Sequence, residues 1–82
     1  MTVNLINLDE FREFVRDGPV IILFQSTWCR TSVVMALAFD KLAKSYLTKV
    51  RFGKVDVDNV KDVINLAAVG AVPECIIYQG SK

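Results

Sequence analysis

A short, unbroken apolar run, Val20 to Phe24, constrains the fold of this chain more than any other segment. It is rich in β-branched residues and follows Gly18-Pro19, so its length and composition favour a β-strand. A strand that is apolar at every position needs cover on both faces, which is typical of a parallel sheet between two layers of helices. The run therefore predicts an α/β fold.

The flanking segments alternate between strand and helix patterns. Further strands are expected at Val3–Ile6, Val50–Val57 and Cys75–Tyr78. Asn7 is expected to cap a first helix, with Glu10 completing a capping box. The apolar stripe of this helix is Leu8, Phe11, Phe14 and Val15. The order β-α-β-α-β-α-β predicts a sandwich with mainly parallel strand pairing.

Two more helices complete this order. The second is expected to begin close to Cys29 and to end near Leu47, and one face of it carries Met35, Phe39, Leu42 and Tyr46. The third is expected to start near Asn59, which is a suitable cap residue. Its apolar positions are Val60, Val63, Ile64 and Ala67.

Composition narrows the function. With 82 residues and no repeat or linker, we expect a single domain over residues 1–82. A net charge of +1 without basic clusters indicates no nucleic-acid partner, and the apolar runs are far short of the ~20 residues that span a membrane. No histidine and only two cysteines argue against a metal site or a cofactor. Low cysteine usage and no signal peptide favour the cytoplasm.

Three motifs carry a family resemblance. They are Trp28-Cys29-x-x-Ser32 after the buried strand, Lys54-Val55-Asp56-Val57-Asp58 in the third strand, and Val72-Pro73 before the last strand. In this order and spacing the chain resembles the thioredoxin family over nearly its whole length. The resemblance implies a thioredoxin-like three-layer sandwich, a cis peptide bond before Pro73, and a position for Pro73 opposite Cys29.

The family pattern also continues past Lys82 with an antiparallel strand and a final helix. If the chain ends at Lys82, the domain is truncated at its C-terminus and the strand Cys75–Tyr78 is an unpaired edge. Its side chains Ile76, Ile77 and Tyr78 would then include uncovered apolar surface. Such an edge favours a homo-oligomer, or pairing with another segment.

Cys29 is the expected nucleophile. At a helix N-terminus, unpaired backbone N–H groups and the helix dipole lower the pKa of a thiol. Arg30 adds a positive charge, Ser32 offers a hydroxyl to the sulfur, and Trp28 adds a flat apolar surface. The alternative is a buried, inert cysteine, since cysteine is often buried.

Ser32 stands where a dithiol oxidoreductase has its second cysteine, so Cys29 acts alone. A mixed disulfide at Cys29 would wait for an external thiol such as glutathione, or for the substrate's own thiol. This predicts an isomerase or deglutathionylation-type activity on protein or glutathione disulfides. Dithiol reduction is not expected.

The sequence also departs from the family pattern elsewhere. The family's buried acid is Leu23 here, and Lys54 remains without it, either to tune charge beneath the site or to reach solvent. Val33 and Leu37 replace a lysine and a proline and enlarge the apolar surface. A negative charge, Glu74, follows Pro73 and would raise the pKa of Cys29 if the two groups approach. The expected substrate-binding surface is Trp28, Arg30, Thr31, Val72, Pro73 and Glu74.

These departures leave alternatives open. The chain could be a non-catalytic adaptor that holds protein partners in the groove around Trp28, Val72 and Pro73. Ser32 could also have been introduced experimentally to trap a mixed disulfide, but Leu23 counts against this. Cys75 is expected to be a small core residue on the side of Pro73 and Ile77, rather than the disulfide partner of Cys29.

Overall fold

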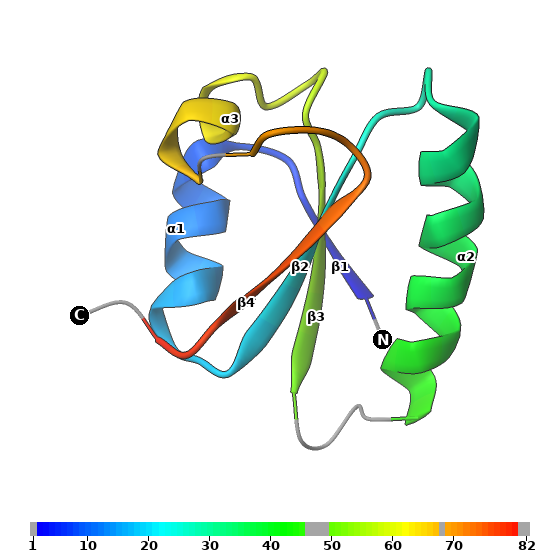
Figure 1. Ribbon diagram of the computed structural model, residues 1–82. Helices are drawn as coiled ribbons and strands as arrows, with labels where there is room; N and C mark the ends of the chain where they lie inside the picture. The colour runs from blue at the N-terminus through cyan, green and yellow to red at the C-terminus, as the bar shows by residue number, and fades with distance from the viewer. Residues whose placement is uncertain (1, 46–49, 68, 81–82) are drawn as a thin grey trace.

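The computed structural model describes residues 2–45, 50–67 and 69–80, which form four strands and three helices around one sheet (Figure 1). The elements are β1 (Thr2–Leu5), α1 (Leu8–Arg16), β2 (Val20–Gln25), α2 (Arg30–Ser45), β3 (Arg51–Asp56), α3 (Asp62–Leu66) and β4 (Glu74–Tyr78). The strand order is β1-β3-β2-β4. β1, β3 and β2 are parallel to their neighbours, and β4 is antiparallel to β2. The predicted α/β sandwich with a mainly parallel sheet is confirmed.

The central strand β2 separates two hydrophobic clusters. Ile22 and Phe24 belong to the larger cluster, which α1 and α3 cover. Leu23 belongs to the smaller cluster beneath α2, with Phe39 and Phe52. Helices thus lie on both faces of the sheet, with α2 on one face and α1 and α3 on the other (Figure 1). This explains why β2 is apolar at consecutive positions.

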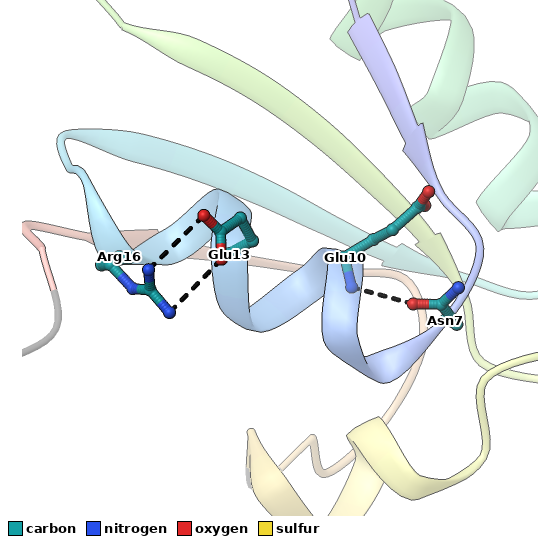
Figure 2. Close-up of polar contacts among 4 residues, drawn as sticks. All are labelled: Asn7, Glu10, Glu13 and Arg16. Carbon is teal, nitrogen blue, oxygen red and sulfur yellow. Dashed lines mark hydrogen bonds and ion pairs between the residues drawn. The ribbon is translucent and has the colours of Figure 1, made fainter.

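The start of α1 follows the predicted cap. The side chain of Asn7 accepts a hydrogen bond from the backbone N–H of Glu10 at 2.8 Å (Figure 2). The carboxylate of Glu10 accepts in turn from the backbone N–H of Ile6 at 2.9 Å, one residue earlier than in a standard capping box. Phe11 and Val15 are buried as the apolar stripe predicts.

The other two helices differ from the prediction in detail. The buried face of α2 is Ser32, Phe39 and Ala43, whereas Met35 and Leu42 are exposed on its flank. The predicted face included Tyr46, and the predicted end near Leu47 lies, like Tyr46, outside the described residues. α3 begins at Asp62 and has no side-chain cap. Asn59 does not cap it, because its side chain donates to Asp56 instead.

The exposure along β4 also corrects the sequence analysis. Ile76 and Tyr78 pack against the larger cluster, whereas Cys75 and Ile77 face away from it and are exposed. Cys75 is therefore not a core residue, because no described element covers that face of β4. Among the described residues, none of the helices is both long and apolar enough to cross a membrane.

Candidate functional site

Two of the sequence motifs meet at one end of the sheet. β2 ends at Gln25, and a short turn leads to α2. β4 runs antiparallel to β2, with Glu74 opposite Phe24, so the start of β4 lies beside the end of β2 (Figure 1). The Val72–Pro73 peptide bond directly before β4 is cis. The direct approach of Pro73 to Cys29 stays a prediction.

Cys29 lies at the N-terminus of α2. Its backbone N–H donates to the carbonyl of Ser26 at 3.2 Å, and its carbonyl accepts from Val33 in the first turn at 3.3 Å. The helix begins at Arg30, so Cys29 takes the N-cap position, and the sulfur of this half-buried residue can accept from the free N–H groups of the first turn. This is the place in a helix where a thiolate is best stabilised.

The pKa of Cys29 is lowered by its neighbours. The backbone N–H of Ser32 contributes most, followed by the Ser32 hydroxyl, and Thr31 adds weaker hydrogen bonds. Partial desolvation of the sulfur opposes the shift without cancelling it. The arrangement favours the thiolate, which is the reactive form of cysteine.

Ser32 is almost completely buried, at 1% exposure. Its Oγ accepts a hydrogen bond from the backbone N–H of Ser26 at 3.3 Å. A hydroxyl has a single proton to donate, and the Ser32 hydroxyl can direct it to the sulfur of Cys29.

The surface around Cys29 is open and partly apolar. Trp28 is 87% exposed, and Val33, Val34 and Leu37 are at least half exposed along the outer side of α2. The other predicted binding residues are Arg30 and Thr31, exposed in the first turn of α2, and Val72 and Pro73, half-buried before β4. Val72 also lines a hollow of about 200 Å³ with Ile64 and Val69, and this hollow is not lined by Trp28 or Cys29.

Glu74 is not among the groups that shift the pKa of Cys29, and its place in the substrate-binding surface stays a prediction. Its carboxylate accepts a hydrogen bond from the backbone N–H of Gly70 at 3.1 Å. Burial, with a smaller contribution from the negative charge of Glu74, raises the pKa of Tyr78, four residues along β4. The carboxylate thus holds the loop before Pro73.

Lys54 has a partner that the sequence analysis missed. Its ammonium lies 3.2 Å from Asp40 Oδ1 and 3.3 Å from Oδ2, and its side chain is only 16% exposed. Burial alone would raise the pKa of Asp40, but hydrogen bonds from Thr2 and Lys54, with the charges of Lys54 and Lys44, hold it below its ordinary value. Asp40 is eleven residues after Cys29, roughly 16 Å along α2. The charge of Lys54 is thus shared with a carboxylate far from the sulfur.

The sequence analysis did not assign Ser26 and Asp58 to the site. Ser26 is buried, and its Oγ donates to Asp58 Oδ2 at 2.6 Å and accepts from the backbone N–H of Trp28 at 3.3 Å. The signal was a small polar residue between the buried strand and Trp28, together with the acidic end of the third-strand motif. Within the described residues, no group of His, Cys, Asp and Glu side chains could hold a metal ion.

Comparison with known proteins identifies relatives of this arrangement. The sequence profile named Thioredoxin matches residues 2–82. A thioredoxin of Coprinus comatus is 36% identical over 78 residues, which are 93% of this chain and 74% of the relative. The oxidised mitochondrial thioredoxin 3 of Saccharomyces cerevisiae is 32% identical with a TM-score of 0.87, over 99% of this chain and 76% of that one.

A further solved chain connects the fold with a partner. It is 34% identical with a TM-score of 0.85, over 95% of this chain and 74% of that chain, and comes from work on thiol resolution in a yeast mitochondrial 1-Cys peroxiredoxin via glutathione and thioredoxin systems. Other relatives are named as chloroplast proteins. The chain spans about three quarters of the length of these first relatives.

Proposed function

Because this chain belongs to the thioredoxin family of thiol–disulfide oxidoreductases, we propose that it exchanges disulfides through a single nucleophile, Cys29. The observation that carries the proposal is the position of the half-buried Cys29 at the N-cap of α2, where the N–H and hydroxyl groups of Ser32 lower the pKa of its thiol. Reactive cysteines are found in environments of this kind, whereas buried structural cysteines are inert.

In the first step, the Cys29 thiolate attacks one sulfur of a protein or glutathione disulfide. A disulfide between Cys29 and the substrate forms, the original S–S bond breaks, and the other sulfur leaves as a thiolate that takes a proton from water. Ser32 donates a hydrogen bond to Cys29 before this step but has no sulfur with which to resolve the product.

The second step therefore needs another thiol. When Cys29 carries glutathione, a second glutathione thiolate attacks the glutathione sulfur, so that glutathione disulfide forms and the Cys29 thiolate is released. This second glutathione supplies the electrons, because it is oxidised to the disulfide while the substrate thiol freed in the first step stays reduced. If a second thiol of the substrate attacks instead, Cys29 is released and the substrate disulfide is rearranged without net oxidation or reduction. No cofactor takes part in either route.

The residues around Cys29 would bind the substrate. Trp28 offers an apolar face, and Arg30 and Thr31 offer polar groups on the first turn of α2. We place the other wall of the groove at Val72 and Pro73, with Glu74 holding their loop. Lys54 supplies a positive charge within the sheet, and we expect its effect on Cys29 to be smaller than that of Ser32 because Asp40 shares that charge.

A second candidate function is partner binding without turnover, as in an adaptor domain. The exposed apolar side chains of Trp28, Val33 and Leu37 beside the site favour it. We also propose a cytoplasmic location, because a chain with only two cysteines fits a reducing compartment, in which Cys29 would stay a thiol.

Mass spectrometry under non-reducing conditions tests the exchange reaction. After incubation with glutathione disulfide or a protein disulfide, we expect one covalent adduct at Cys29, which an added small thiol releases. Cys75→Ser should keep the adduct and Cys29→Ser should lose it. Partner capture that persists in Cys29→Ser without any adduct would favour the adaptor, and repeated insulin reduction with thioredoxin reductase alone would contradict the single-cysteine mechanism.

A further inference from the structure

The turn that leads from β2 into α2 is held by one side chain, Ser26. This residue is 8% exposed and directly follows β2. Its Oγ donates to Asp58 Oδ2 at 2.6 Å and accepts from the backbone N–H of Trp28 at 3.3 Å. Its carbonyl accepts from the backbone N–H of Cys29 at 3.2 Å. Ser26 therefore binds the backbone N–H groups of both Trp28 and Cys29 and fixes the turn before the sulfur.

The backbone N–H of Ser26 binds Ser32, the residue whose hydroxyl group neighbours the sulfur of Cys29. It donates to Ser32 Oγ at 3.3 Å, and this hydroxyl is buried. Because the oxygen of Ser32 is engaged as an acceptor from Ser26, the hydroxyl proton is left to point elsewhere. The sulfur of Cys29 is the acceptor that the helix start places next to it.

Asp58 anchors this arrangement to the sheet. It lies in the turn after β3, and its own backbone N–H donates to Asp56 Oδ1 at 2.9 Å. The backbone N–H of Val57 donates to the carbonyl of Gln25 at 2.9 Å, so the ends of β2 and β3 are tied directly beneath the turn. A short hydrogen bond to a carboxylate is stronger than one between neutral groups.

We propose that Ser26, held by Asp58, is a positioning residue for the thiol: by fixing the Trp28–Cys29 turn, it orients the hydroxyl of Ser32 toward Cys29. This proposal deepens the proposed function and rests on Cys29 being the nucleophile. Neither Ser26 nor Asp58 is among the groups whose hydrogen bonds lower the pKa of Cys29, so their effect must pass through Ser32.

The pH dependence of Cys29 alkylation by iodoacetamide tests the proposal, measured in a Cys75→Ser background. Ser26→Ala removes the hydroxyl that binds Asp58 and Trp28, and we expect alkylation at pH 7 to be roughly threefold slower, with the midpoint moved upward. Ser26→Thr keeps a hydroxyl and should restore the original profile. Asp58→Ala at an exposed position should give the same upward direction, and Asp58→Asn a smaller change.

A double variant separates positioning from simple stabilisation. If Ser26 acts through Ser32, then adding Ser26→Ala to Ser32→Ala should slow alkylation by less than it does in the parent chain. An unchanged profile in Ser26→Ala with only a loss of unfolding free energy would overturn the proposal, and so would fully additive effects. If Ser26→Ala does not fold, an unchanged profile in Asp58→Ala overturns it equally.

The parent chain distinguishes this proposal from the function beneath it. An ordinary thiol midpoint for Cys29, with no adduct on a disulfide, would contradict the proposed exchange reaction whatever the variants do. A lowered midpoint that Ser26 and Asp58 variants leave in place would keep the exchange reaction and reject the positioning role.

Discussion

Ser32 occupies the place from which a second thiol would reach Cys29, three residues along the first turn of α2 and almost fully buried. We predict that Ser32→Cys restores a dithiol site, because the new sulfur would replace an oxygen that already hydrogen-bonds the Cys29 sulfur. After mild oxidation in a Cys75→Ser background, a thiol titration should find no free thiol in Ser32→Cys. The parent background should keep Cys29 titratable.

The mixed disulfide gives a second measurement on the same variant. In Ser32→Cys the adduct at Cys29 should be released without any added thiol, since the neighbouring sulfur attacks it. A variant whose adduct persists until glutathione is added would show that position 32 does not reach the bond.

The two cysteines should differ in reactivity at neutral pH. Hydrogen bonds from Ser32 lower the pKa of Cys29, whereas desolvation raises the pKa of Cys75. Both side chains are accessible, so Cys75 serves as an internal control for access. We predict that one equivalent of iodoacetamide at pH 7 modifies Cys29 first, as peptide mass spectrometry would show. Equal labelling would mean that the N-cap position does not activate the sulfur.

An ion pair between Asp40 and Lys54 links α2 to β3. We predict that Asp40→Asn lowers the free energy of unfolding by about 1 kcal/mol, a modest value because the Asp40 side chain is 42% exposed and the ion pair is partly screened. Urea denaturation would measure it. The matched control is Glu13→Gln, which breaks the exposed pair of Glu13 and Arg16 in Figure 2 and should change stability little.

The contribution of Asp40 has a defined pH dependence. Its pKa in the folded chain is lower than its ordinary value of 3.8, so unfolding binds protons near that pH. The stabilisation is therefore complete above the unfolded value and is lost as the pH falls through the folded value. In Asp40→Asn the stability curve should lose this acid-side step. A step of the same size in both chains would assign it to other carboxylates.

How far the elements follow from the sequence depends on how much of their stability is local. The helix α1 has its cap at Asn7 and its apolar stripe within one continuous segment, so both were predictable. α3 is only five residues long and has no side-chain cap, and its position is set by packing of Val60 and Val63 on the larger cluster. Pattern alone placed its start too early.

In the candidate site, too, the local interactions were predictable from the sequence and the contacts between distant segments were not. The Trp28-Cys29-x-x-Ser32 motif predicted the helix start and the hydrogen bond from Ser32, because both arise within a few residues. The partners of Ser26 and Lys54 come from segments 32 and 14 residues away. Such contacts are decided by strand order and helix rotation, which periodicity does not specify.

At the scale of the whole molecule, we propose that residues 1–82 form one domain whose sheet has two edges, β1 and β4. Each edge strand pairs with one neighbour among the described residues. The β4 edge carries an exposed apolar side chain on its open face. Ile77 is 63% exposed there, and Met35 and Leu42 are exposed on α2. By helical spacing they lie on the flank opposite Asp40, which faces β1 and β3.

We therefore predict that the 82-residue chain associates with a second copy through β4. Antiparallel pairing of the two edges would satisfy backbone groups and bury Ile77, and complete burial of such a side chain contributes about 1.5–3 kcal/mol. Charged substitutions at Ile76 or Tyr78 would disrupt the core instead, since both pack inward.

Light scattering over a dilution series should show a dimer that Ile77→Lys weakens. The matched control is Val3→Lys on the β1 edge, where 44% of Val3 is exposed. It should leave the dimer intact, because its edge lies at the far side of the sheet. A dimer that Val3→Lys dissociates and Ile77→Lys does not would place the contact at β1, and a monomer at all concentrations would contradict association through either edge.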